Sequence, residues 1–229
     1  KNIFNLKIKL KLIICEKPIS YSLNDSKYIC NSLSKLDIPL FFNYMRRSDP
    51  GVLEIKRRID EEIIKQPIKG ICCYSKGIYN NASHFINLLE YWLGNPKKII
   101  TISHNRKISE NDFESDFKIY FEKGSIIFSS LFEENFSYNS IELFCSNGII
   151  EYFKKGDKIN WRDIILDKDF KDYKILEPSE KEIKHKMNVS QKNVVNEIYN
   201  FLESKSYNLC NYKSALSTSS IISKVVYEN

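Results

Sequence analysis

The chain has 229 residues, of which 42% are hydrophobic and 28% are charged, and its formal net charge is +6. These proportions are typical of a globular protein and argue against a disordered chain. Basic and acidic side chains are interspersed without long blocks of one sign, so the mildly basic balance suits an anionic ligand, and we expect no nucleic-acid partner.

The cysteines indicate a reducing compartment. The six of them form no Cys-x-x-Cys motif, and none of the three histidines lies at a metal-ligand spacing from any of them. We therefore expect free thiols, a cytoplasmic location and no metal site. No apolar run approaches the roughly 18 residues that a bilayer requires. The N-terminus has no signal-peptide core, so we expect no membrane partner.

The first predicted unit is a strand, a helix and a second strand. Residues 1–10 resemble the tail of a helix or a linker, and the apolar run 12–15 predicts a buried strand that Pro18 ends. A helix is predicted over 22–36, with Ser22 as N-cap and Asp25 in the capping-box position. Residues 38–43 predict the second strand. A βαβ unit of this kind has parallel strands and a right-handed connection.

A second region begins at the helix-start signal Asp49-Pro50-Gly51. We expect a surface helix over 52–64, a strand over 68–76, and a helix over 83–93 that Gly94 and Pro96 stop. Strand patterns then cover residues 98–103, 115–122, 125–132, 139–145, 148–153 and 159–166, and Asn147-Gly148 is a hairpin signal. Helices over 190–203 and 215–227 close the chain.

This order predicts an α+β fold. The terminal βαβ unit is similar to the last one of a Rossmann domain, and an open, mainly antiparallel sheet with helices on one face follows it. We divide the chain into a remnant of a dinucleotide-binding domain (1–47) and a substrate-binding and oligomerisation domain (48–229). The second face of such a sheet needs a cover. We expect some of a set of apolar side chains to pack there against a second subunit, namely Ile126, Phe128, Leu143, Ile150 and Phe153.

Two short stretches carry the candidate chemistry. Glu16, Lys17 and Pro18 lie where the first strand ends, which is where open α/β sheets place their ligands. The alternative is a strand that reaches solvent and carries an ion pair there. His84 opens an apolar helical pattern, a position where histidine is often only capped or solvated.

Together these stretches resemble the Gfo/Idh/MocA family, named after glucose-fructose oxidoreductase and inositol dehydrogenase. In that family a Glu-Lys-Pro follows a Rossmann strand, and a Gly-x-x-(Asn/Asp)-x-x-x-His motif, here Gly77 to His84, opens a helix of the second domain. Asn43-Tyr44, Arg46-Arg47 and Pro50 after the second strand add to the resemblance, which runs from about residue 11 to the C-terminus.

The resemblance implies an NAD(P)-dependent oxidoreductase that transfers hydride between nicotinamide and a sugar or cyclitol hydroxyl. Oxidising a hydroxyl needs a base with a pKa near neutrality, which the imidazole of His84 provides. Lys17 could hold the substrate hydroxyl or the nicotinamide ribose, and could share the proton if burial lowers its pKa. The resemblance implies catalytic roles of this kind for both residues.

Further residues are candidates for binding. We expect Tyr44, Arg46, Asn80 and Asn81 to contact substrate, and Glu16, Lys17, Pro18 and Arg47 to contact cofactor. The alternatives are a core role for Tyr44, an interdomain ion pair for the arginines, and an ordinary turn at Asn80-Asn81. Many family members have Asp where this chain has Asn80, and often Asp where it has Asn87. An amide orients a hydroxyl but carries no proton, so these departures put a proton relay in doubt.

None of the seven glycines forms Gly-x-Gly-x-x-Gly, the fingerprint that holds a pyrophosphate at a helix N-terminus. The family carries it ahead of the Glu-Lys-Pro. We therefore expect NAD or NADP to bind weakly to this chain, and the chain by itself to be inactive. The alternative function is a non-catalytic truncated relative that acts as an oligomer subunit or a sugar-binding pseudoenzyme. In either case we expect a homo-oligomer formed through the open sheet.

Overall fold

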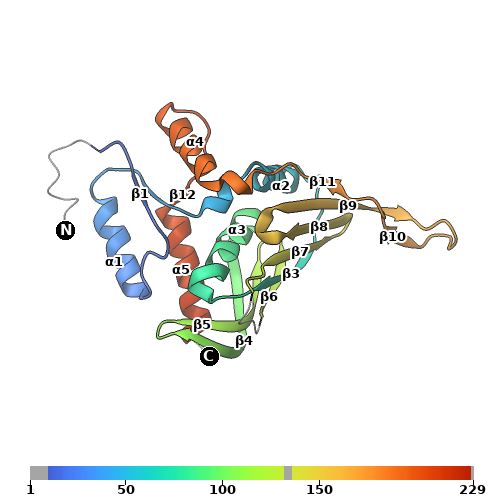
Figure 1. The fold of residues 1–229 in the computed structure, drawn as a ribbon, viewed down its shortest axis with the longest axis horizontal. Coiled ribbons are helices and arrows are strands. Elements are labelled where there is room, and N and C mark those ends of the chain that lie inside the picture. Colours follow the sequence, from blue (N-terminus) through green and yellow to red (C-terminus); the bar gives the residue numbers. More distant parts are fainter. Residues whose placement is uncertain (1–9, 132–135, 228–229) are drawn as a thin grey trace.

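The computed structural model describes residues 10–131 and 136–227, so all but the last residue of the predicted N-terminal linker lies outside the described residues. A small sheet contains β1 (Ile13–Cys15), β2 (Leu40–Phe42) and β12 (Cys210–Asn211), in that order (Figure 1). β1 and β2 run parallel, with Ile13 opposite Leu40, and α1 (Leu23–Ser34) connects them. The predicted βαβ unit with parallel strands is confirmed.

The start of α1 follows the predicted capping chemistry. The Ser22 hydroxyl accepts a hydrogen bond from the backbone N–H of Asp25 at 3.2 Å, which satisfies one of the free donors of the first turn. Cys30 and Leu33 on one side of the helix are buried against β1 and β2.

The next helix also begins at its predicted signal. A 3-10 turn, η2 (Met45–Ser48), leads to α2 (Pro50–Asp60), whose first residue is a proline. The buried Asp49 carboxylate caps α2 by accepting hydrogen bonds from the N–H groups of Gly51 at 2.9 Å and Val52 at 3.4 Å. A surface helix was predicted here, but α2 also contributes to the core, because its own residues Val52, Ile55 and Ile59 are buried.

The large sheet has nine strands in the order β10-β9-β8-β7-β3-β6-β5-β4, with β11 paired to β9. Their bounds are β3 (Ile68–Tyr74), β4 (Pro96–Ser109), β5 (Asp112–Phe121), β6 (Gly124–Ser130), β7 (Ser140–Cys145), β8 (Gly148–Phe153), β9 (Lys158–Leu166), β10 (Lys174–Leu176) and β11 (Lys181–Glu182). Within the described ranges, β3 and β6 form its one parallel pair. The predicted mainly antiparallel sheet is therefore confirmed, while β10, β11 and β12 were not predicted.

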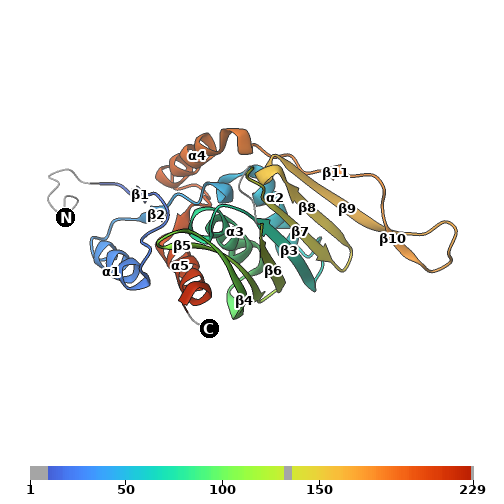
Figure 2. The same ribbon diagram turned by 60° about the horizontal axis from the view of Figure 1, so that its bottom comes forward.

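Helices cover one face of this sheet (Figure 2). They are α2, α3 (Ser83–Leu93) and α5 (Tyr212–Tyr227), and a short π-helix, η3 (Ile78–Ala82), leads into α3. The bounds of α3 agree with its predicted range, and it ends at Gly94 with φ +86°. Two 3-10 turns, η4 (Lys154–Gly156) and η5 (Met187–Val189), and the helix α4 (Ser190–Leu202) complete the structure.

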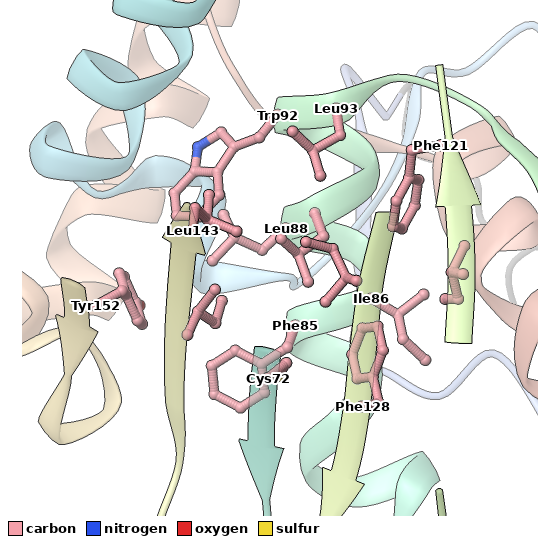
Figure 3. Packing of buried hydrophobic residues seen from close by; sticks show 14 of the residues in the cluster. Cys72, Phe85, Ile86, Leu88, Trp92, Leu93, Phe121, Phe128, Leu143 and Tyr152 are labelled. Atoms are coloured by element: carbon pink, nitrogen blue, oxygen red, sulfur yellow. The ribbon is translucent and has the colours of Figure 1, made fainter. Parts of the chain in front are cut away.

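The main core lies between the sheet and these helices, and Figure 3 shows Trp92, Leu88 and Leu143 at its centre. Trp92 is 0% exposed, and its indole N–H donates to the Val52 carbonyl at 3.0 Å. The rings of Phe117 and Phe128 stack at 4.4 Å. Trp92 therefore belongs to the core.

The sequence prediction for the open face of the sheet was wrong. Four of the five side chains predicted to lie on that face are 0% exposed and pack under the helices, namely Ile126, Phe128, Leu143 and Ile150. The fifth, Phe153, is half-buried. Side chains alternate between the two faces of a strand, so the neighbouring residues carry the open face. There Ile71, Ile127 and Phe144 are 41%, 40% and 45% exposed.

The C-terminal part of the chain returns to the small sheet. β12 pairs with β2 in antiparallel fashion, with Cys210 opposite Phe42. Val194 of α4 packs against Phe41. Residues beyond the predicted boundary at 47/48 thus share a core with the N-terminal unit, and the division into two domains stays a prediction. None of the helices in the described ranges has the length and apolarity that crossing a bilayer requires.

Candidate active site

The ends of the two parallel strands meet as expected. The Glu16 carboxylate, just past β1, accepts a hydrogen bond at 2.7 Å from the side-chain amide of Asn43, which follows β2. The Asn43 amide also donates to Gln191 of α4 at 3.2 Å. The Lys17–Pro18 peptide that comes next is cis. Glu16 is therefore held at the strand ends by a neighbour from β2.

Lys17 reaches from this edge to the start of the helical segment η3. Its amine donates a hydrogen bond to the backbone carbonyl of Asn80, and it lies 3.4 Å from the carbonyl oxygen of Tyr79. Burial lowers the pKa of Lys17, while the negative charges of Asp112 and Glu16 oppose this shift. The tertiary fold thus joins the two sequence motifs at one point.

His84 lies in the first turn of α3, close to the same point. Its ring contacts the buried Tyr44 ring edge to face, with 5.8 Å between the centroids. Its Nδ1 atom is buried and has no hydrogen-bond partner among the described residues. Burial lowers the pKa of His84 well below its ordinary value, and the charges of Lys17 and Arg46 add to this effect. His84 is therefore neutral at pH 7, but it is a weaker base than the near-neutral imidazole that the sequence predicted.

A buried carboxylate holds the turn that carries these groups. Asp112, the first residue of β5, accepts hydrogen bonds from the N–H groups of Tyr79 at 2.9 Å and Asn80 at 3.2 Å. Gly77 has φ +88°, and a Cβ atom there would overlap the Asp112 carboxylate, so glycine is required for both reasons. The sequence did not indicate Asp112, because only the tertiary fold brings β5 to this turn.

Comparison with known proteins finds one relative in sequence and several in structure. No family model matches the chain. Over 117 residues it is 32% identical to scyllo-inositol 2-dehydrogenase (NAD(+)) of Bacillus subtilis strain 168, a match that covers 45% of this chain and 34% of that protein. The matched region thus spans about a third of the relative's length.

Solved structures of oxidoreductases share the fold. A putative NADPH-dependent oxidoreductase from Desulfitobacterium hafniense has a TM-score of 0.75 at 15% identity, over 94% of this chain and 70% of that one. Levoglucosan dehydrogenase in complex with NADH and L-sorbose has a TM-score of 0.73 at 16% identity, with the same coverage. The WlbA dehydrogenase from Bordetella pertussis has a TM-score of 0.66 at 13% identity, over 93% and 68%. The resemblance to the Gfo/Idh/MocA family is confirmed.

Asn80, Asn81 and Asn87 have different surroundings. The Asn80 side chain is exposed, so it is free to meet a ligand. The Asn81 amide instead donates to the Ser75 carbonyl at 2.7 Å and stabilises the turn. Asn87 is buried, and its amide donates to Thr218 of α5 at 3.0 Å. Of the three, Asn80 is the residue that the structure leaves available for substrate.

The two arginines predicted to bind ligands point in different directions. Arg46 is buried, stacks 4.7 Å from the centre of the Phe85 ring, and donates to the Tyr152 hydroxyl and the Lys155 carbonyl. Its charge still acts on His84. Arg47 lies along α3, 4.4 Å from the centre of the Tyr91 ring. The structure therefore places Arg46 against Phe85, the chain neighbour of His84, and Arg47 against Tyr91 further along α3.

Metal ligands do not gather at this point. Among the described residues there is no group of three or more His, Cys, Asp or Glu side chains that would hold a metal ion.

Glu90, further along α3, is a partly buried acid that is hydrogen-bonded to α5. The hydroxyls of Ser217 at 2.6 Å and Thr218 at 2.5 Å donate to its two carboxylate oxygens. Burial raises its pKa to about 7, and the charge of Arg47 opposes the shift. The folded protein therefore binds a proton more tightly than the unfolded chain, so stability falls as the pH rises from about 4.5 to about 7.

The variant Glu90→Gln should remove this dependence, because a neutral amide replaces an acid that must ionise while buried. Relative to the wild type, we expect its free energy of unfolding to increase with pH between 5 and 8, by up to about 3 kcal/mol. Urea denaturation of both proteins at several pH values measures this. A difference between the two that stays constant with pH would contradict the assignment.

Proposed function

We propose that this chain is the catalytic and substrate-binding part of an NAD(P)-dependent oxidoreductase that transfers hydride between nicotinamide and a sugar or cyclitol hydroxyl. The observation that carries the proposal is the meeting of the Lys17 amine with the turn that opens the His84 helix. Two of the similar proteins, an inositol dehydrogenase and a sugar-bound dehydrogenase, support it.

The neutral imidazole of His84 would accept the hydroxyl proton of the substrate. An ammonium group has three N–H donors, and the carbonyls of Tyr79 and Asn80 engage two of those of Lys17. The third would bind a substrate or ribose hydroxyl and fix its orientation for deprotonation. Tyr44 beside His84, the Arg46 charge and the exposed Asn80 amide would complete the substrate side.

The residues present fit one end of a dinucleotide. Glu16, Lys17 and Pro18 lie at the carboxyl end of β1, where parallel sheets bind their ligands, and we propose them as contacts of the nicotinamide half. Arg47 stays a prediction as a cofactor contact, since it lies apart from these residues. Bound NAD or NADP would supply the hydride acceptor, and this chain would hold the substrate against it.

The specific observation that favours the alternative, a sugar-binding pseudoenzyme or oligomer subunit, is Asn80. Many family members have an acid there, and an amide cannot carry a proton. Activity decides between the two functions. We would join the chain in frame to the dinucleotide-binding region of the B. subtilis relative and measure NADH formation with a panel of cyclitols and sugars.

We expect turnover with at least one member of the panel, and loss of it in the same fusion carrying His84→Asn. Titration of the unfused chain with NADH by tryptophan fluorescence should show weak binding. A fusion that binds NAD⁺ and a cyclitol or sugar without oxidising the cyclitol or sugar would instead support the pseudoenzyme.

We propose that the chain forms a homo-oligomer through the open face of the large sheet. Ile71 of β3 lies directly beside Ile127 of β6, and Phe144 is on the strand that flanks β3 on its other side. An exposed apolar group of this kind marks an interaction site.

We also propose a reducing, cytoplasmic location, which the six free cysteines support.

The double variant Ile71→Lys/Ile127→Lys should be monomeric, because the charges cannot be buried unpaired at an interface. Light scattering at tens of micromolar measures the mass of this variant and of the wild type, for which we expect a dimer or larger. Tyr28→Lys is the matched control, since Tyr28 is 74% exposed on α1, away from the sheet. A monodisperse wild-type monomer would contradict the proposal.

A further inference from the structure

The Asp112 carboxylate is placed as a second anchor for Lys17, although the two side chains do not touch. Asp112 is only 5% exposed, and both of its oxygens accept backbone hydrogen bonds from the η3 turn. A buried carboxylate is costly unless donors surround it, so this turn is shaped around a negative charge. The positive φ of Gly77 and its lack of a Cβ atom give that charge its space.

One peptide group joins the two residues. The N–H of Asn80 donates to Asp112 at 3.2 Å, and the carbonyl of the same peptide, that of Tyr79, lies 3.4 Å from the Lys17 amine. Hydrogen bonds at the two ends of one peptide group polarise it in the same direction, so each strengthens the other. The Asn80 carbonyl, one peptide further on, provides the second acceptor for Lys17.

The charges around Lys17 come from four elements. Glu16 follows β1 and Asp112 begins β5, and both favour the charged amine, whereas Arg46 of η2 opposes it. His84 of α3 is neutral at pH 7 because its pKa is lowered. Glu16 is exposed and hydrogen-bonded to Asn43. Asp112 is therefore the buried negative charge that faces this amine.

We propose that Asp112 is a positioning residue for Lys17, which through the Tyr79–Asn80 peptide fixes the amine on two carbonyls and keeps it charged, with its third N–H directed to a ligand. Only one part of this rests on the proposed function, namely that the third N–H contacts a substrate hydroxyl. The coupling between Asp112 and Lys17 is a property of the folded chain and is measurable without any turnover.

The test is the pKa of the Lys17 amine in the whole 229-residue chain. NMR of lysine labelled with ¹³C at Cε, or acetylation of Lys17 mapped by mass spectrometry across a pH series, measures it. In Asp112→Asn the pKa should fall by about one unit, so that about tenfold more neutral amine is present at a given pH. The variant keeps the size of the side chain and removes its charge.

Glu114→Gln is the matched control. Glu114 is also buried on β5 and accepts the N–H of Lys76 from the same turn at 2.7 Å, but it does not bind the Tyr79–Asn80 peptide. We expect it to change the Lys17 pKa by less than about 0.3 units, because the bridging peptide is intact. Equal shifts in both variants, or no shift in Asp112→Asn, would overturn the proposal.

A reciprocal measurement keeps the test independent of how well Asp112→Asn folds. Coupling between two charges is reciprocal, so Lys17→Met, which removes the charged amine, should raise the pKa of Asp112. The ¹³C shift of the Asp112 carboxyl reports this. An Asp112 pKa that does not respond to Lys17→Met would equally refute the coupling, whereas an inactive fusion would refute only the proposed function.

Discussion

In the fusion of this chain with a dinucleotide-binding region, His84→Asn should lower kcat by roughly 10²- to 10⁴-fold, the amount that a general base contributes. Asparagine has a similar size and polarity but accepts no proton at neutral pH, so the fold and the affinity for NADH should not change. Steady-state kinetics of the fusion protein, with circular dichroism and NADH titration as controls, measures this. A variant with wild-type kcat would eliminate the mechanism.

The pH dependence of kcat should also identify His84 as the base. The pKa of His84 is lowered, so the base is already deprotonated at pH 6.5 and kcat should not rise above that pH. On the alkaline side kcat should fall as Lys17 loses its proton, at a pH below the ordinary lysine value because burial lowers that pKa too. A rise of kcat between pH 6.5 and 8 would assign the base to another group.

Lys17→Met should reduce both turnover and substrate binding, because the amine contacts the hydroxyl in the ground state as well as in the transition state. Combined with His84→Asn, the losses should be less than additive, since two residues that act on one proton work as a unit.

Asn80→Asp tests the effect of restoring the acid that many family members have at this position. Higher turnover or a shifted pH optimum would indicate drift from an active ancestor, and lower turnover would indicate that the amide suits the substrate.

Trp92→Ala should destabilise the protein by about 3–5 kcal/mol, the range for deleting a fully buried large aromatic side chain. Trp92 is 0% exposed, its indole donates to Val52 of α2, and its ring contacts Tyr152 of β8 edge to face at 6.0 Å. The substitution therefore opens a cavity where α2, α3 and the sheet meet. Urea denaturation at pH 7 measures the loss.

Two controls make this result specific. Trp92→Phe keeps most of the volume and loses the indole hydrogen bond, so its effect should be clearly smaller. Tyr28→Ala removes an aromatic ring that is 74% exposed and should change stability by less than about 0.5 kcal/mol. A Trp92→Ala variant as stable as Tyr28→Ala would show that α3 does not pack on the sheet as described.

Much of the local structure was predictable from the sequence because its signals are local. The Ser22 cap, the Asp49-Pro50 helix start and the Gly94 stop each act through bonds to residues within a turn, and all three lie where they were predicted. The catalytic candidates Lys17 and His84 were also identified from short motifs. Such motifs name the residue types that the chemistry needs, but they hold no information on what surrounds them.

The tertiary structure decided which face of each strand is covered and where the longer side chains go. Alternation along β6 shows that Ile127 and Phe128 face opposite sides, but only the position of α3 and α5 puts Phe128 in the core. Arg46 and Arg47 are adjacent in sequence, yet Arg46 stacks on Phe85, the chain neighbour of His84, and Arg47 turns toward Tyr91. Asp112 joins the site because β5 is placed beside η3, a contact between distant segments that no local pattern encodes.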